Sequence, residues 1–219
     1  MIQPAAVARP VIAAAPVAAP VASALAVASF HTHVSDASRQ LDLIKANVAG
    51  FTGMILLENL TWVCIAVACV ATAIRLKGRG AWPAAIGAFL GVVGAAGSLD
   101  GWGAPLPTLA RQTDRSAAVW FVNHVGPIYA INGALGSVLM IGLLLTFVAL
   151  WRARLLHVAY LGVFLLGAAL LSFTGGNPIG MLGAFALFAV AGLQITRFLL
   201  RPAGVPDKAV LPEHDHVAA

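Results

Sequence analysis

Long apolar runs alternate with short polar segments along this chain. Five runs are long enough for a helix to cross the hydrocarbon core of a bilayer, which takes roughly 20 residues at about 1.5 Å each. They are Phe51–Ile74, Trp82–Leu99, Ile128–Trp151, Leu155–Phe173 and Ile179–Leu200. The pattern predicts an all-α fold: a polytopic membrane helix bundle with about five transmembrane helices.

Two shorter segments show a helical pattern without spanning length. In Ser35–Val48 the apolar residues, such as Leu41 and Ile44, share one helical face, which predicts an amphipathic helix on the membrane surface ahead of the first span. Ala117–Gly126 is apolar but ends before Pro127, which cannot continue a straight helix. We therefore expect a short broken helix, interfacial or re-entrant, before the third span.

The first 34 residues are rich in Ala and Pro. Three interpretations fit them. The first is a secretory signal, with Arg9 before an apolar stretch and small-residue cleavage sites further on. The second is a disordered tail. The third is an extra, weak transmembrane helix, although Pro16 and Pro20 would interrupt it. The chain thus divides into a signal-like or disordered segment (1–34), a transmembrane domain (35–201) and a polar cytoplasmic tail (202–219).

Composition supports a membrane protein. Hydrophobic residues make up 60% of the chain and charged residues only 10%, whereas a soluble domain is about half apolar and a quarter charged. The net charge is +5, but the basic residues form short clusters after apolar runs and not one patch. That distribution excludes nucleic acid as a partner and is typical of residues that orient membrane helices.

Orientation follows from the same clusters. With five spans they all fall on one side, which is then cytoplasmic. We expect the amino terminus outside and the carboxyl terminus in the cytoplasm. A sixth span at the start would move the amino terminus inside. The Ala-rich composition favours a bacterial inner membrane.

The first span contains a carboxylate, Glu58. A charged residue in hydrocarbon costs at least about 2.5 kcal/mol. Thr61, Ile65 and Thr72 lie on the same helical face as Glu58, so this face should contact protein or water.

Further polar residues fall at a similar depth, which suggests a ligand-binding or proton-linked pocket open to the outside. Its candidate residues are Glu58, Asn59, His124 and Asn132. The alternative is that Glu58 is only a hydrogen-bonded contact that holds the bundle together.

The second span carries a stripe of small residues, among them Gly87, Gly91 and Gly94. Such stripes let two helices approach closely. A stripe that faces outward would indicate a membrane-protein partner or a homo-oligomer. A stripe inside the bundle would favour a self-contained carrier.

Metal and cofactor signals are weak. His31 and His33 form an H-x-H pair whose ligand type suits copper or zinc. His124 and His157 fall at opposite membrane faces and cannot ligate one haem, so no cofactor is clearly implied.

Enzyme signatures are also missing from the sequence. It contains no C-x-x-C, no H-E-x-x-H and no phosphate-binding loop, which favours a non-enzymatic protein over an enzyme. The first functional interpretation is an accessory or assembly subunit that packs with other membrane proteins. The alternative is a small-solute or ion carrier with an outward-facing pocket at Glu58. A redox or quinone-linked membrane enzyme is third.

Overall fold

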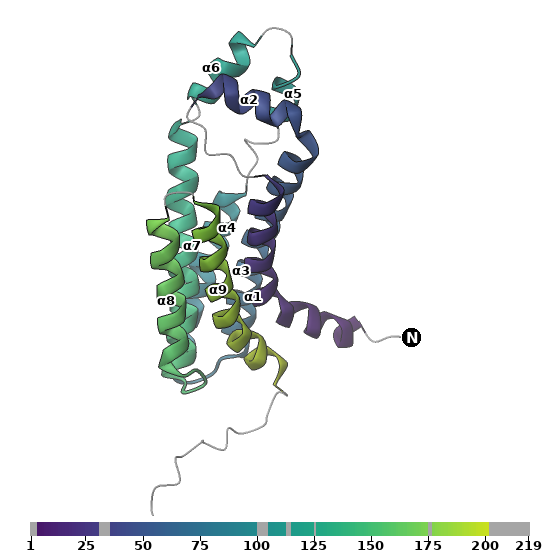
Figure 1. Cartoon of the computed structure of the whole chain (residues 1–219). Helices are drawn as coiled ribbons and strands as arrows, with labels where there is room; N and C mark the ends of the chain where they lie inside the picture. The colour runs from purple at the N-terminus through teal and green to yellow at the C-terminus, as the bar shows by residue number, and fades with distance from the viewer. Residues whose placement is uncertain are drawn as a thin grey trace, which may run out of the picture.

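The computed structural model describes residues 4–30, 36–99, 105–112, 115–124, 126–174 and 177–201. All regular structure in these ranges is helical, which confirms the predicted all-α membrane bundle (Figure 1). The helices are α1 (Pro4–Ser29), α2 (Ala37–Ala46), α3 (Val48–Arg75), α4 (Ala81–Ser98), α5 (Leu106–Leu109), α6 (Ser116–His124), α7 (Gly126–Arg152), α8 (Val158–Phe173) and α9 (Pro178–Leu200).

Among the described residues, five helices are long and apolar enough to cross a membrane: α1, α3, α4, α7 and α9. The number agrees with the prediction, but α1 takes the place of the expected span Leu155–Phe173. There the chain turns at Arg154, which has a positive φ of 60°. His157 then caps α8, which has only 16 residues and is about 24 Å long.

The amino-terminal segment forms a helix, so the expectation of a disordered tail is wrong for residues 4–29. Pro10, Pro16 and Pro20 all lie inside α1, and its first turns run sideways from the bundle (Figure 1). Pro20 has no N–H for the Pro16 carbonyl. Gly192 of α9 lies so close to that carbonyl that a side chain there would overlap it. Packing against α3 and α9 therefore holds together a helix that is weak alone.

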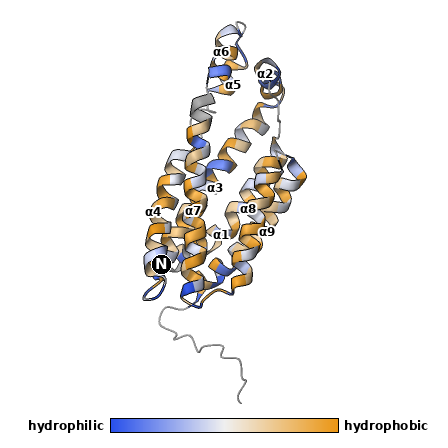
Figure 2. Cartoon of the chain, turned by 90° about the vertical axis from the view of Figure 1, so that its left-hand side faces the viewer, coloured by the Kyte–Doolittle hydropathy of each residue, from blue (hydrophilic) through white to orange (hydrophobic). Residues whose placement is uncertain are grey.

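Six helices form an open ring. Along the ring α7 packs on α4, α4 on α3, α3 on α1, α1 on α9 and α9 on α8. The ring closes more sparsely between α8 and α7, where the rings of Phe147 and Phe164 meet with their centroids 4.9 Å apart. In Figure 2 these helices carry mostly hydrophobic residues, with hydrophilic residues gathered towards their ends.

The small-residue stripe of α4 faces the interior of the bundle. A Cβ at Gly87 would lie 2.7 Å from the Gly142 oxygen of α7, and one at Gly94 would lie 2.5 Å from the Leu139 nitrogen. Gly91 contacts Cys69 of α3. Backbones this close explain why the positions carry glycine.

Three short helices, α2, α5 and α6, form a cap at one end of the bundle (Figure 1). Leu41 and Ile44 of α2 are fully buried in an apolar cluster with Leu106 of α5 and Ala118 of α6. The prediction of an amphipathic helix is correct, but its apolar face packs on protein and not on the membrane surface.

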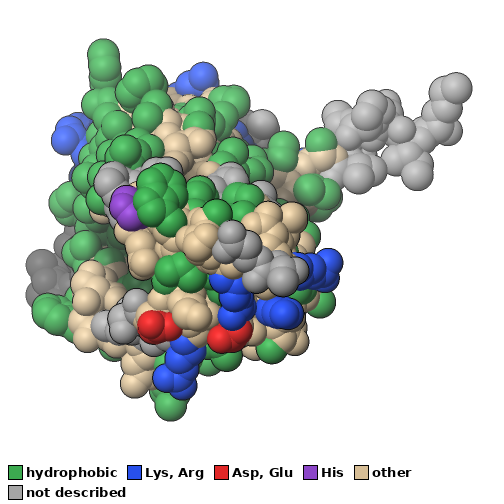
Figure 3. Space-filling model, turned by 90° about the horizontal axis from the view of Figure 1, so that it is seen from above, with side chains coloured by type: hydrophobic (Ala, Val, Ile, Leu, Met, Phe, Trp, Pro, Cys, Tyr) green, Lys and Arg blue, Asp and Glu red, His purple; other side chains and the backbone are tan. Residues whose placement is uncertain are grey.

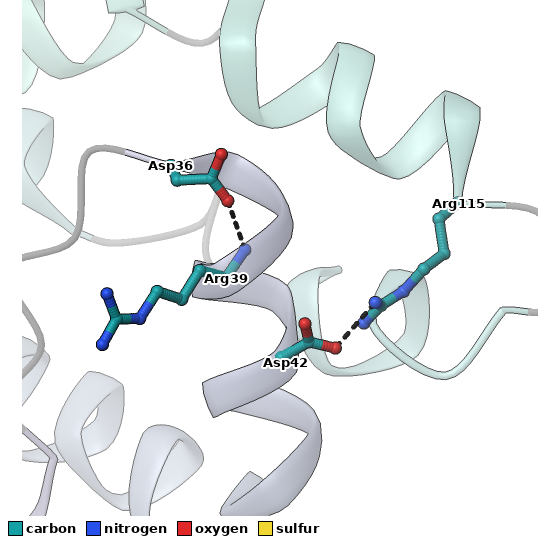
Figure 4. Close-up of polar contacts among 4 residues, drawn as sticks. All are labelled: Asp36, Arg39, Asp42 and Arg115. Atoms are coloured by element: carbon teal, nitrogen blue, oxygen red, sulfur yellow. Dashed lines mark hydrogen bonds and ion pairs between the residues drawn. The ribbon is translucent and has the colours of Figure 1, made fainter.

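Polar contacts complete the cap. The Asp36 carboxylate accepts a hydrogen bond from the Arg39 backbone N–H at 2.7 Å and so caps α2. Asp42 forms an ion pair with Arg115, also at 2.7 Å (Figure 4). Seen from this end, charged side chains of both signs gather at one side of the molecule (Figure 3).

The opposite end is basic. Arg9 of α1 donates a hydrogen bond to the Leu200 carbonyl at 2.7 Å and another to the Arg201 carbonyl. Arg75 of α3 donates to the carbonyls of Leu199 and Arg201. The last carbonyls of a helix lack partners within it and attract cations. Two guanidinium groups therefore tie α1 and α3 to the end of α9.

Candidate binding cavity in the membrane bundle

The ring of helices encloses a cavity of about 730 Å³. All six helices of the ring contribute to its wall. The volume lies within the range of about 300–1,000 Å³ that is typical of small-molecule sites.

The polarity of the wall changes along the membrane normal. Consecutive ring helices run in opposite directions, so the sequence position of each lining residue gives its depth. The polar lining residues lie in the half nearer the cap and are Ser23, Glu58, Thr61, Ser98, Asn132, Ser137 and Ser172. The half nearer the basic end is apolar, with Phe147, Phe164, Phe188 and Ile195 among its residues.

One acidic residue belongs to the cavity lining. Glu58 lines it, while none of the described lining residues is Lys, Arg or His. The predicted face of the first span is confirmed, because Thr61, Ile65 and Thr72 are buried in the bundle. Low polarity around a carboxylate strengthens its interaction with a positive or hydrogen-bond-donating group.

Thr61 also connects α3 to α1 beside the cavity. Its hydroxyl donates to the Leu57 carbonyl at 2.9 Å, and its oxygen lies 3.2 Å from the Ala19 carbonyl and 3.1 Å from the Ser23 hydroxyl. Such contacts between membrane helices contribute about 0.6–2 kcal/mol. They fix α1 as part of the cavity wall.

One lining residue carries a buried hydroxyl. Ser98, at the end of α4, is only 5% exposed, and its Oγ has no hydrogen-bond partner among the described residues. Across from it, a Cβ at Gly136 of α7 would lie 3.8 Å from this Oγ, with no closer contact. Asn132 lies one turn before Gly136 on the same face of α7. A buried hydroxyl without a partner costs about 1–3 kcal/mol.

Some residues of the cavity lining on α7 and α8 are exposed. Gly133, Ser137 and Ile141 of α7 and Ser172 of α8 line it and are also exposed. Nearer the basic end the gap is closed by the contact between Phe147 and Phe164. The exposed part of the lining therefore lies beyond this contact, on the side of the cap.

The structure brings together only part of the predicted pocket. Glu58 and Asn132 line one cavity, whereas Asn59, the next residue of α3, does not. His124 is exposed on the cap, where its ring stacks on Trp120 and its Nδ1 lies 2.7 Å from the Trp120 carbonyl oxygen. Because these residues are four apart on α6, they pair locally and His124 stays away from the cavity.

The proposed metal residues His31 and His33 lie outside the described residues. Within those residues, no group of three or more His, Cys, Asp or Glu side chains is placed to hold a metal ion.

Sequence reasoning missed much of the wall. Residues of α1, such as Ser23, were not candidates because the prolines argued against a helix there. Ser98 was not a candidate either; it lies one turn after Gly94, at the end of the small-residue stripe of α4. Its helical spacing from Gly94 was the available signal, since it places a polar side chain on the face of α4 that packs inside the bundle.

Comparison of the chain with protein-family models, with curated proteins and with solved structures finds no match. The five spanning-length helices and their apolar surfaces define the chain as a polytopic membrane protein.

Proposed function

We propose that this protein is a membrane carrier that binds a small solute in the cavity between α1, α3, α4, α7, α8 and α9. The observation that carries the proposal is the cavity, which has the volume of a small-molecule site and a carboxylate in its wall. Glu58 and Asn132 are the residues we expect to hold the solute.

The packing of α4 favours a carrier over an accessory subunit. Gly87, Gly91 and Gly94 pack against α7 and α3, so they are not available to a second protein. The exposed surface of α4 carries large apolar side chains such as Ile86 and Phe89, as expected for a helix that faces lipid. The accessory subunit that packs with another membrane protein stays a prediction without this support, and so does a homo-oligomer.

The orientation belongs to the same proposal. Arg9 contacts the end of α9, so the amino and carboxyl ends of the bundle lie together. The basic clusters around Arg75 and Arg152 share that end, and basic residues favour the cytoplasmic side. We infer six crossings of a bacterial inner membrane, made by the five spanning-length helices and by the shorter α8, which returns the chain from the basic end towards the cap. Both termini are then inside, instead of the amino terminus outside.

Labelling of single cysteines tests the orientation. In a chain without native cysteines, Arg79→Cys at the basic end should react only after the membrane is made permeable. Arg39→Cys on the cap should react in intact cells. Equal reactivity of both, or the reverse pattern, would overturn the orientation.

Filling the cavity tests the carrier. Gly136→Phe places a ring in the cavity, where a Cβ meets only the Ser98 hydroxyl at 3.8 Å. The matched control is Gly162→Phe on α8, which has open space around it and does not line the cavity.

The wild-type protein and both variants are purified in mild detergent and extracted with organic solvent, and the extracts are compared by mass spectrometry. The wild type and Gly162→Phe should release a compound that Gly136→Phe lacks. Proteoliposomes should then take up that compound with wild-type protein and not with Gly136→Phe. Identical extracts from all three proteins, or equal uptake, would refute the proposal.

A further inference from the structure

We infer that the solute is an amphipathic amine, a molecule with a protonated amino head and an apolar chain, which enters sideways from the bilayer between α7 and α8. This inference deepens the proposed function and rests on it. Three features of the cavity carry it: its lengthwise change in polarity, the chemistry of its polar half and the position of its exposed lining.

The change in polarity favours an amphipath over a compact polar solute. The half of the cavity near the basic end is walled by Phe147, Phe164 and Phe188, whose rings pack on one another. A fully hydrophilic solute would leave water or its own polar groups against these rings, at a cost in free energy. An apolar chain gains about 25 cal/mol for each Å² of surface it buries there.

The polar half selects the head group. Glu58 is the acidic residue of the described lining, and no basic residue accompanies it there. A carboxylate or phosphate head would therefore meet like charge in a region of low polarity. A protonated amine would meet a charge of opposite sign and can donate three hydrogen bonds.

Ser98 supplies a second, independent indication of a ligand. Its Oγ is buried and has no partner among the described residues, and Ser98 belongs to the lining of the cavity. An ammonium group that donates to this oxygen removes the cost of the orphaned hydroxyl. Asn132, one turn from Gly136 on the adjacent helix α7, also lines the cavity and is a second polar side chain for the same head.

The exposed part of the lining determines the route. The exposed lining residues Gly133 and Ser137 of α7 and Ser172 of α8 lie in the polar half, at the depth where the head would sit. These helices contact each other sparsely, which leaves room for a lateral route between them. An amphipath already in the bilayer reaches the cavity here without crossing water.

A pair of quenchers that differ only in the head group tests the inference. Trp62 lines the cavity, and a variant that keeps it while Trp82, Trp102, Trp120 and Trp151 become Phe reports on that site alone. The probes are stearylamine and stearic acid, each with a nitroxide on its chain. Both are titrated into the protein in nanodiscs of neutral lipid. Saturable quenching that Gly136→Phe abolishes measures binding inside the cavity.

We expect the amine to bind at least tenfold more tightly than the acid. Glu58→Gln should weaken the amine at least tenfold and reduce its preference over the acid. The matched control is Asp36→Asn, which removes one carboxylate at the same end of the molecule, outside the cavity, and keeps a good helix cap. It should bind the amine as the wild type does.

Ser98→Ala separates binding from folding. Because it removes an unsatisfied hydroxyl, it should leave the melting temperature of the ligand-free protein unchanged or higher while it weakens the amine severalfold. Equal binding of amine and acid, or full amine affinity in Glu58→Gln, would overturn the inference and leave the carrier proposal intact. Absence of any saturable quenching by either probe would also overturn the inference, and the comparison of extracts and uptake with Gly136→Phe would then decide the carrier on its own.

Discussion

The contact between α4 and α7 gives a prediction whose size follows from the structure. A Cβ at Gly142 of α7 would lie 2.6 Å from the Gly91 nitrogen and 2.7 Å from the Gly87 oxygen. Favourable contacts between carbon atoms need about 3.5–4.0 Å. In Gly142→Ala the two helices must therefore move apart by roughly 1 Å, against the packing that holds them together.

The matched control lies on the same helix. A Cβ at Gly133 would meet nothing within 4 Å. In both variants the free energy of unfolding rises by about 1 kcal/mol from helix propensity, since Ala favours a helix more than Gly does. Only Gly142→Ala incurs an overpacking cost of about 1–3 kcal/mol. The difference between the two variants isolates that cost.

Cys69 provides the assay. It is fully buried and lies beside Gly91, so a fluorogenic maleimide should report its exposure on heating in a Cys64→Ala background. For a chain of this size, a change of 1 kcal/mol in the free energy of unfolding shifts the melting temperature by about 2–4 °C. The melting temperature of Gly142→Ala should therefore lie about 2–12 °C below that of Gly133→Ala. If both variants shift by the same amount in the same direction, the close approach of α4 and α7 is wrong.

Further predictions concern α1 and the cap. Gly192→Leu should detach α1 from α9, because any side chain there overlaps the Pro16 carbonyl; protease cleavage within α1 should become rapid, and unchanged resistance would contradict the contact. Leu41→Ala should destabilise the cap by about 2–5 kcal/mol because it empties a fully buried site, measured as faster hydrogen exchange in α2. Asp42→Ala removes the ion pair with Arg115, in which the Asp42 side chain is 61% exposed and the Arg115 side chain 30%. The stability of the cap should fall by only about 0.2–1 kcal/mol. A larger effect in Asp42→Ala than in Leu41→Ala would contradict the view that burial, and not the ion pair with Arg115, holds the cap.

Apolar length and helical spacing were sufficient to predict most of the bundle. The runs that became α3, α4, α7 and α9 are long, and few polar residues interrupt them. The break before α7 also follows from local sequence, because Pro127 disfavours a continuous helix there. The inward face of α3 followed from the cost of placing Glu58 in lipid.

The role of α1 could not be derived in the same way. Pro16 and Pro20 weaken a helix in isolation, and the sequence does not show that Gly192 packs against the carbonyl freed by Pro20. The partner of α2 was hidden for a similar reason. Leu106 belongs to a helix of four residues, too short for any periodic signal.

The cavity was predictable only in part. Glu58 and Asn132 share a depth in the sequence pattern, and both line it. His124 has a suitable depth too, but helical spacing pairs it with Trp120. The apolar half of the cavity exists only because α1 and α8 complete the ring, which is a property of the tertiary fold.

Native mass spectrometry of the purified protein, released from mild detergent, tests the central claim most directly. We predict a monomer of this chain that carries one small molecule, lost on activation in the gas phase and absent from Gly136→Phe. A bare chain in both proteins, or a complex that contains a second polypeptide in fixed proportion, would contradict the carrier and favour an accessory subunit.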